Sequence, residues 1–392
     1  HHRVHCSSTV DDSRCFAGRL SDPAYLRQTR NLELAGRLRM DIGICVPSHI
    51  GDTDYIVRAE ELGYSHAWLA DSQMIWSDCY ATLALAAYRT SKIKLGTGVA
   101  ITGTRPASVN AAGIATINAL APGRTFFGVG AGNTAMRVMG LPPHRIAKFE
   151  SYLEELSPLL RGEESLLNYQ GDQIPIKHIM PDKGFVNFED PIPLYVSGFG
   201  PRSLGLAGKY GDGAVLALPS SPAVMENLWG LMESNSPPGF DRSNFYTTGL
   251  TAMIVQDEDE AIDSVRIKSE CGAMVMASVH YAYDQWRNFG HQPPNAMSGI
   301  WDDYTRLLED YPEDRRHQRI HLGHNCWVLP EEEKFVTSDL IKATCMVGTQ
   351  DELIERLAAL NEAGLNQVMN LPSFDPRFKV LEDIAEKIIP HV

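Results

Sequence analysis

The sequence predicts an α/β fold, a (β/α)8 TIM barrel with insertions, and three observations carry this prediction. The chain has 392 residues, of which 44% are hydrophobic, and this is enough for one large barrel. From Met40 onward, short β-branched runs alternate with helical segments. These runs number eight, the strand count of this fold. A doubly wound sheet is the competing architecture, but it would usually show a second, distinct domain.

The expected strands are nearly continuous apolar runs bounded by Gly, Pro or Asp, a pattern typical of parallel strands buried on both faces. They cover residues 41–47, 66–70, 93–101, 124–129, 193–197, 213–218, 249–255 and 366–371.

The segments between the strands carry helix signals. Tyr55, Ile56, Ala59 and Leu62 form an apolar stripe, and Gly63 follows at the position of a C-terminal cap. Residues 79–89 and 107–120 are rich in Ala, and residues 349–352 form a capping box before another apolar stripe.

Three segments depart from this repeat. Residues 1–39 are expected to be an N-terminal extension; their paired histidines resemble a tag remnant, and they contain no apolar run typical of a secretory signal. Residues 40–392 are expected to form one barrel domain. Residues 162–192 indicate a long loop or a short hairpin. Residues 271–346 form an aromatic-rich insertion, either a packed lid or subunit contact over one barrel face, or extra helices of the outer ring.

Composition excludes several classes of protein. The net charge of −14, from 49 acidic and 35 basic residues, argues against nucleic-acid binding. No apolar run reaches 18 residues, so no membrane span is expected. The seven cysteines are scattered and odd in number, which indicates neither a disulfide framework nor a zinc finger. We therefore expect a cytoplasmic protein in a reducing compartment.

The clearest chemical signal is the segment from Tyr195 to Lys209, where a strand runs through a glycine turn into a helix. Free N–H groups at a helix start, together with the helix dipole, favour a phosphate group. Gly198 and Gly200 permit close approach, and Arg202 or Ser203 would add a direct contact. The third glycine of a dinucleotide fingerprint is replaced by Ser203. A plain tight turn remains the alternative.

Other glycines also stand at expected strand ends. Gly128, Gly130 and Gly132 alternate after an apolar run, and Gly98 lies within another strand. They would expose bare backbone to a flat ligand, or simply form a bulge or turn. Asp71, Ser72 and Gln73 follow the second strand, and Asp71 would serve equally well as a helix cap.

Motifs for other chemistries are missing. His321 and His324 form an HxxH pair, but no acidic partner stands at ligand spacing, and HExxH does not occur. We therefore expect no metal site and take these histidines as surface, core or substrate-contact groups, which disfavours a metal-hydrolase barrel. GxSxG and P-loop motifs are also absent.

Several segments together resemble the luciferase-like flavin oxidoreductases. They are residues 67–71, 84–87, 90–99, 121–132, 144–163 and 347–365. The resemblance spans residues 40–390, with 271–346 the least typical part. It implies a (β/α)8 barrel that binds FMN or coenzyme F(420) at the carboxyl ends of its strands. Members are monooxygenases using reduced FMN and oxygen, or reductases that transfer a hydride, such as methylene-tetrahydromethanopterin reductase.

The resemblance also implies roles for particular residues. The Gly98–Val99 peptide falls where many members have a non-proline cis bond, which forms a bulge behind the flavin ring. Gly130, Gly132 and Asn133 would line the rest of the ring. The cofactor phosphate would be held by Ser197, Gly198, Gly200, Pro201, Arg202 and Ser203.

Two departures from the family narrow the expected activity. Deazaflavin members often carry His where this chain has Ser72, and sugar-phosphate-oxidising members carry Glu where it has Asn133. Sugar-phosphate oxidation is therefore not expected. Asp71, Ser72, Gln73 and histidines of the insertion remain as polar catalytic candidates, with the cofactor carrying the chemistry.

The expected function is thus a monooxygenase that uses reduced FMN and oxygen on a small organic substrate. A separate flavin reductase is the expected partner, because no nicotinamide fingerprint is present. The alternatives are an F(420)-dependent reductase or dehydrogenase and a non-catalytic flavin-binding barrel. The resemblance further implies a homodimer or tetramer.

Overall fold

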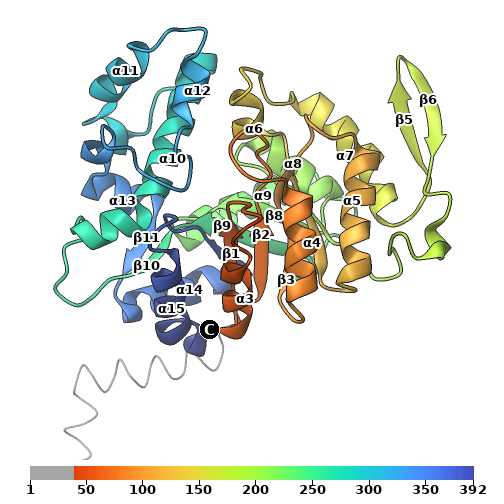
Figure 1. Cartoon of the computed structure of the whole chain (residues 1–392), viewed down its shortest axis with the longest axis horizontal. Helices are drawn as coiled ribbons and strands as arrows, with labels where there is room; N and C mark the ends of the chain where they lie inside the picture. Colours follow the sequence, from red (N-terminus) through yellow and green to blue (C-terminus); the bar gives the residue numbers. More distant parts are fainter. Residues whose placement is uncertain (1–38) are drawn as a thin grey trace, which may run out of the picture.

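The computed structural model describes residues 39–392, whose centre is a closed barrel of eight parallel strands (Figure 1). Around the ring the strand order is β1-β2-β3-β4-β7-β8-β9-β12. These strands are β1 (Asp41–Val46), β2 (His66–Leu69), β3 (Lys94–Ile101), β4 (Thr125–Gly130), β7 (Leu194–Ser197), β8 (Gly213–Ala217), β9 (Tyr246–Thr251) and β12 (Gln367–Asn370). The predicted α/β barrel is confirmed.

Helices follow most barrel strands and cover the outside of the ring. They are α3 (Asp54–Glu61), α4 (Cys79–Arg89), α5 (Ala107–Leu120), the short α6 (Asn133–Arg137), α7 (Ile146–Leu160), α8 (Pro201–Tyr210), α9 (Pro222–Glu233), α14 (Gln350–Glu362) and α15 (Arg377–Lys387). The predicted capping box of α14 is present, because Thr349 N–H donates to the Glu352 carboxylate at 2.9 Å.

One predicted strand was wrong. Residues 249–255 include the end of β9 and all of β10 (Met253–Val255), which leaves the barrel and pairs with β11 (Met346–Gly348). The true barrel strand begins earlier with buried threonines, whose hydroxyls are satisfied inside the barrel. Thr248 Oγ1, for example, donates to the side-chain oxygen of Gln367 at 2.8 Å. A search for apolar runs therefore misses the start of β9.

Aromatic side chains fill the amino-terminal part of the barrel. Trp68 and Phe126 pack with ring centroids 4.2 Å apart, and Tyr195 lies 5.6 Å from both. A Cβ on Gly96 would lie 2.3 Å from the Phe126 ring, so this mid-strand glycine makes room for the ring. The filled lower barrel leaves open space only towards the carboxyl ends of the strands.

Two insertions stand on opposite sides of the barrel (Figure 1). The segment 162–192 contains the antiparallel hairpin β5 (Ser165–Tyr169) and β6 (Asp172–Ile176). The segment between β10 and β11 contains four helices, α10 (Val265–Phe289), α11 (Trp301–Glu309), α12 (Arg316–Ile320) and α13 (Ser338–Thr344).

The remaining predictions concern the chain ends, cysteines and membrane spans. Residues 1–38 of the predicted extension lie outside the described residues. The cysteines between 39 and 392 are buried and unpaired, so this part of the chain has no disulfide framework. None of its helices combines the length and apolar character needed to cross a membrane.

Candidate functional site

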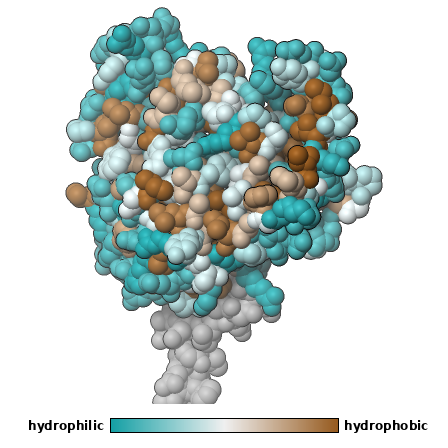
Figure 2. Space-filling view, turned by 45° about the vertical axis from the view of Figure 1, so that its right-hand side comes forward, coloured by the Kyte–Doolittle hydropathy of each residue, from teal (hydrophilic) through white to brown (hydrophobic). Residues whose placement is uncertain are grey.

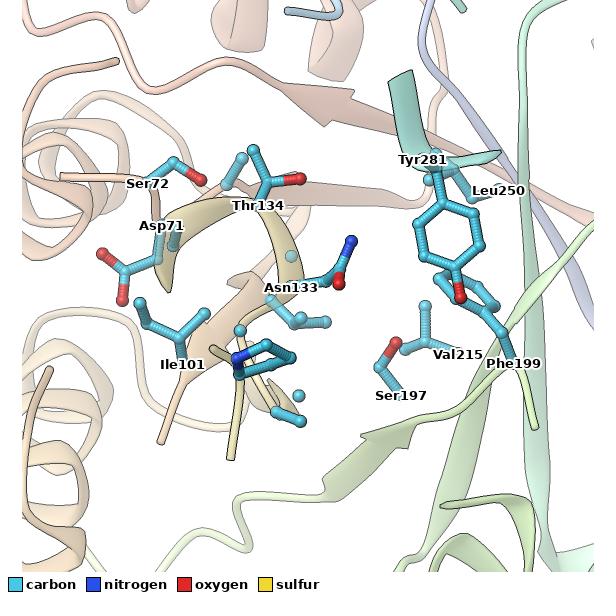
Figure 3. Close-up of a pocket in the computed structure, with 18 of the residues that line it drawn as sticks. Asp71, Ser72, Ile101, Asn133, Thr134, Ser197, Phe199, Val215, Leu250 and Tyr281 are labelled. Atoms are coloured by element: carbon cyan, nitrogen blue, oxygen red, sulfur yellow. The ribbon is translucent and has the colours of Figure 1, made fainter. Parts of the chain in front are cut away.

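A pocket of about 390 Å³ lies at the carboxyl ends of the barrel strands. Barrel strands and their following loops supply Asp71, Ser72, Val99, Ser197 and Met369 to its wall. Helix α10 supplies Tyr281, Gln285 and Phe289, so the late insertion lies against the pocket. Figure 3 shows the open space between Asn133 on one side and Phe199, Tyr281 and Val215 on the other.

Bare backbone forms part of this wall. The Gly98–Val99 peptide bond is cis, as the family resemblance implies, and a Cβ on Gly98 would lie 2.5 Å from the Cβ of Trp68. Gly130 faces Val99, whose Cγ2 would lie 3.0 Å from an added Cβ. Gly132 has a φ of 85°, a left-handed conformation that favours glycine. All of these glycines line the pocket.

Helix α6 begins at the pocket edge, directly after Gly132. Asn133 Oδ1 accepts a hydrogen bond from Nε of Arg137 at 3.1 Å, which fixes the amide. That amide points into the open space, as does the hydroxyl of Ser72 (Figure 3). The pocket therefore presents neutral hydrogen-bonding groups to a ligand.

The turn between β7 and α8 forms another part of the wall. Gly200 N–H donates to Ser203 Oγ at 3.3 Å, which in turn donates to the Gly200 carbonyl at 3.0 Å. A Cβ on Gly198 would lie 2.8 Å from the Ser203 backbone, whereas one on Gly200 would meet nothing within 4 Å. Of the predicted phosphate residues, Ser197, Gly198, Gly200 and Ser203 line the pocket.

Two predicted phosphate residues lie outside the lining. Pro201 and Arg202 occupy the first turn of α8 and are exposed. Pro201 has no N–H, so the free donors of this helix start belong to the residues after it. The dipole of the ten-residue helix still favours an anion here.

The predicted catalytic residues have different surroundings. Asp71 is buried, and its Oδ2 accepts a hydrogen bond from Nη1 of Arg105 at 2.5 Å. Burial raises the pKa of Asp71, and Arg105 offsets part of the rise. Its carboxylate points away from the open space (Figure 3). Gln73 donates to the Ala135 carbonyl at 3.0 Å and lies outside the lining, whereas Asp71, Ser72 and, from the insertion, His324 line the pocket.

Sequence reasoning missed the aromatic pair at the far side of the pocket. Phe199 and Tyr281 approach edge to face, with ring centroids 6.1 Å apart. Burial raises the pKa of Tyr281, so its phenol is protonated and able to donate a hydrogen bond at neutral pH. The aromatic density of residues 271–346 was the available signal, but it did not identify the residue that reaches the pocket.

A cluster of three buried histidines lies beside the pocket. His280 comes from α10, whereas His321 and His324 come from the turn after α12. Burial lowers the pKa of His280, and it lowers the pKa of His324 well below the usual value, so both rings are neutral at pH 7. The HxxH pair was visible in the sequence, but the distant His280 was not associated with it.

The sequence of this chain is similar to those of several characterised enzymes. The family model described as luciferase-like monooxygenase matches residues 42–367. The 5,10-methylenetetrahydromethanopterin reductase of Archaeoglobus fulgidus is 27% identical over 343 residues, covering 86% of this chain and 94% of that protein. The F(420)-dependent glucose-6-phosphate dehydrogenase of Beutenbergia cavernae is 26% identical, covering 86% of this chain and 92% of that protein.

Solved structures share the fold. The coenzyme F(420)-dependent tetrahydromethanopterin reductase of Methanopyrus kandleri has a TM-score of 0.66 at 21% identity, covering 90% of this chain and 99% of that chain. The oxygenating constituent of 3,6-diketocamphane monooxygenase from Pseudomonas putida, in complex with FMN, has a TM-score of 0.57 at 18% identity, with the same coverage of both chains.

Proposed function

The chain belongs to the luciferase-like monooxygenase family of oxidoreductases, and from this membership we propose that it is a coenzyme F(420)-dependent enzyme that transfers hydride to or from a small organic substrate. The single observation that carries the proposal is the glycine-lined pocket at the strand ends. The choice of cofactor is supported by the reductase and dehydrogenase relatives, which align with most of the chain.

The residues present fit such a cofactor. The backbone at Gly98, Gly130 and Gly132 lines the pocket and suits the face of a flat ring, and Asn133 would hydrogen-bond its edge. The open volume over Gly200, at the start of α8, suits an anionic group. When bound, F(420) would donate or accept a hydride through its deazaflavin ring.

The protein's own groups would position the substrate. Ser72, Asn133 and the Tyr281 phenol are neutral hydrogen-bonding groups. They would orient a polar substrate without placing a charged side chain beside it. Phe199 and the aliphatic side chains of Val215 and Leu250 would exclude water from the other side. The ion pair of Asp71 with Arg105 would hold the end of β2 in place.

An FMN-dependent monooxygenase is the second candidate, because the matching family model is itself described by that activity. The same pocket residues would hold the FMN ring and phosphate. Under this alternative a separate flavin reductase would supply the reduced cofactor.

Parallel titrations test the proposal. Purified protein would be titrated with oxidised F(420) and with FMN, following cofactor fluorescence, and then screened for substrate-dependent change in F(420) absorbance. We expect F(420) to bind at least tenfold more tightly than FMN. Preferential FMN binding with substrate-dependent oxygen consumption would favour the monooxygenase, and binding of neither cofactor would overturn both candidates.

A further inference from the structure

We propose that His280, His321 and His324 form a binding site for one divalent transition-metal ion of the Zn²⁺ type, at the edge of the pocket. This inference departs from the absence of a metal site expected from the sequence, and it does not depend on which cofactor the pocket binds.

The three rings converge in a buried space. Their exposed fractions are 2%, 4% and 8%, and one potential ligand atom from each lies within 4.8 Å of the others. Tetrahedral bonds of about 2.0–2.1 Å place nitrogen ligands about 3.3 Å apart, so small ring rotations would close the site around an ion. The His321 and His324 ring centroids are 5.2 Å apart, and His280 lies 6.0 and 6.5 Å from them.

A tight turn directs both histidines of the HxxH segment inward. Gly323 has a φ of 77°, and a Cβ there would lie 2.8 Å from the Trp327 carbonyl oxygen. His324 N–H donates to the His321 carbonyl at 3.1 Å, while the intervening Leu322 is exposed. The backbone thus holds two imidazoles on the same side of the turn, facing His280.

Each ring keeps a nitrogen without a protein partner. In all three rings Nδ1 is buried and forms no hydrogen bond with the described residues. Buried polar atoms are normally satisfied, so this concentration of unpaired nitrogen atoms calls for a ligand between them. A metal ion would accept a lone pair from each ring at once.

Carboxylates lie behind two of the three rings, as they do behind many metal-bound histidines. His321 Nε2 lies 3.0 Å from Oδ2 of Asp284, one helical turn after His280. His280 Nε2 lies 3.5 Å from the Glu332 carboxylate. His324 Nε2 lies 3.0 Å from the side-chain amide nitrogen of Asn325 and 3.4 Å from Oγ1 of Thr134. Carboxylates behind ligating imidazoles orient the rings and raise their basicity.

The ligand set indicates the class of ion. Neutral imidazole nitrogens suit Zn²⁺, Co²⁺, Ni²⁺ and Cu²⁺ rather than Mg²⁺ or Ca²⁺, which prefer oxygen. Arg137 and Arg319 lie against Asp284 and Glu332, so the carboxylate charges are already balanced. Three protein ligands would leave one tetrahedral position for water or another small ligand.

Occupancy of this site would affect the pocket wall. His324 itself lines the pocket, and His280 directly precedes Tyr281, which also lines it. A metal ion would fasten the turn after α12 to α10, and with it two parts of the pocket lining.

Cobalt binding to the full chain tests the proposal. Protein stripped with a chelator would be titrated with CoCl2, whose tetrahedral complexes give visible absorption bands, and then with ZnCl2 to displace the cobalt. We expect one equivalent of Co²⁺ with tetrahedral bands. His280→Asn should weaken affinity at least about a hundredfold, and Asp284→Asn about tenfold, because it removes only a supporting carboxylate.

His291→Asn, at an exposed histidine just beyond α10, is the matched control and should bind as wild type does. His1, His2 and His5 occur in all these proteins, so binding by them would not distinguish the variants. Unchanged bands in a folded His280→Asn protein would overturn the proposal, as would their absence in wild type.

A second measurement needs no variant. In crystals of the wild-type protein soaked with ZnCl2, the anomalous difference map should show a peak between the three rings. The lack of a peak between the three rings would overturn the proposal, whatever peaks occur elsewhere and even if the histidine variants fail to fold.

Discussion

Gly200 is the residue at which an anion at the start of α8 can be tested with least disturbance of the fold. A Cβ there meets nothing within 4 Å, so Gly200→Ala should preserve both fold and cofactor affinity. Gly200→Asp places a negative charge beside the proposed phosphate, and we expect at least about a tenfold loss of affinity. Fluorescence titration of both variants measures this. Equal affinities for Asp and Ala variants would argue against a phosphate at this position.

Arg105 compensates the buried charge of Asp71. Its guanidinium also reaches Asp78 at 2.9 Å, but that carboxylate is exposed and contributes little. Arg105→Gln would leave Asp71 buried and unpaired, and should lower the free energy of unfolding by about 3 kcal/mol. Urea denaturation measures the loss.

The double variant Asp71→Asn/Arg105→Gln is the control for this ion pair. It should recover much of the stability, because two neutral groups replace the charge left without a partner. A double variant that is no more stable than Arg105→Gln would contradict this account.

At the scale of elements, Glu60 joins α3 to the turn before β3. Its carboxylate accepts hydrogen bonds from the N–H groups of Ser91, Lys92 and Ile93 at 2.9, 2.6 and 2.8 Å. Burial alone would raise the pKa of Glu60, but these donors outweigh it and lower the pKa. The carboxylate therefore stabilises the fold above its unfolded pKa, and this contribution is lost as pH falls through the lower folded value.

Glu60→Gln should accordingly cost about 1 kcal/mol at pH 7, and this difference should shrink below pH 4. Thermal or urea unfolding of both proteins at several pH values measures it. Glu61→Gln, at the exposed neighbour, is the control. A cost that stays constant from pH 7 to pH 3 would contradict the role of the charge.

The elements also show where sequence reasoning succeeds. Seven barrel strands were predicted to within a residue at each end, because buried parallel strands are local apolar runs with clear boundaries. The eighth, β9, was misplaced because its buried Thr247 and Thr248 look polar until Gly364 and Gln367 supply their acceptors.

The candidate site likewise combines local sequence signals with contacts between distant segments. The glycine turns at Gly130 and Gly198 are local signals, and the sequence placed them at strand ends. The pairing of Asp71 with Arg105 and the approach of Tyr281 to Phe199 depend on contacts between distant segments. No periodicity in a single sequence records such contacts.

For the molecule as a whole, His66 links stability to pH. It lies buried in the lower barrel between Trp68 and Tyr246, and burial lowers its pKa to about 3. In the unfolded chain this histidine binds a proton near pH 6.5. Its contribution to the free energy of unfolding is therefore complete above that pH and is lost as pH falls towards its pKa in the folded protein. Between pH 7 and pH 5 this residue should reduce the free energy of unfolding by about 2 kcal/mol.

Comparison with His66→Gln isolates this effect. The variant should be less stable at pH 7, yet it should lose about 2 kcal/mol less than wild type between pH 7 and pH 5. Urea denaturation at both pH values measures the difference, and His291→Gln is the exposed control. Parallel losses in wild type and His66→Gln would show that His66 does not carry this dependence.

Assembly is a further expectation at this scale. Apolar side chains form several separate groups over the face in Figure 2, rather than one continuous patch. The homodimer or tetramer implied by the family remains a prediction. Light scattering coupled to size-exclusion chromatography should give two or four chain masses, and a single chain mass would contradict it.

The parallel strands β10 and β11 form the base of the late insertion. The chain leaves the barrel through β10, builds α10 to α13, and returns along the neighbouring strand, with Val255 paired to Gly348. Both ends of the excursion are therefore anchored at one place, outside the closed ring of eight strands. A change of sequence in this segment would therefore alter Tyr281, Gln285 and Phe289 in the pocket wall without touching the eight barrel strands or the pocket glycines.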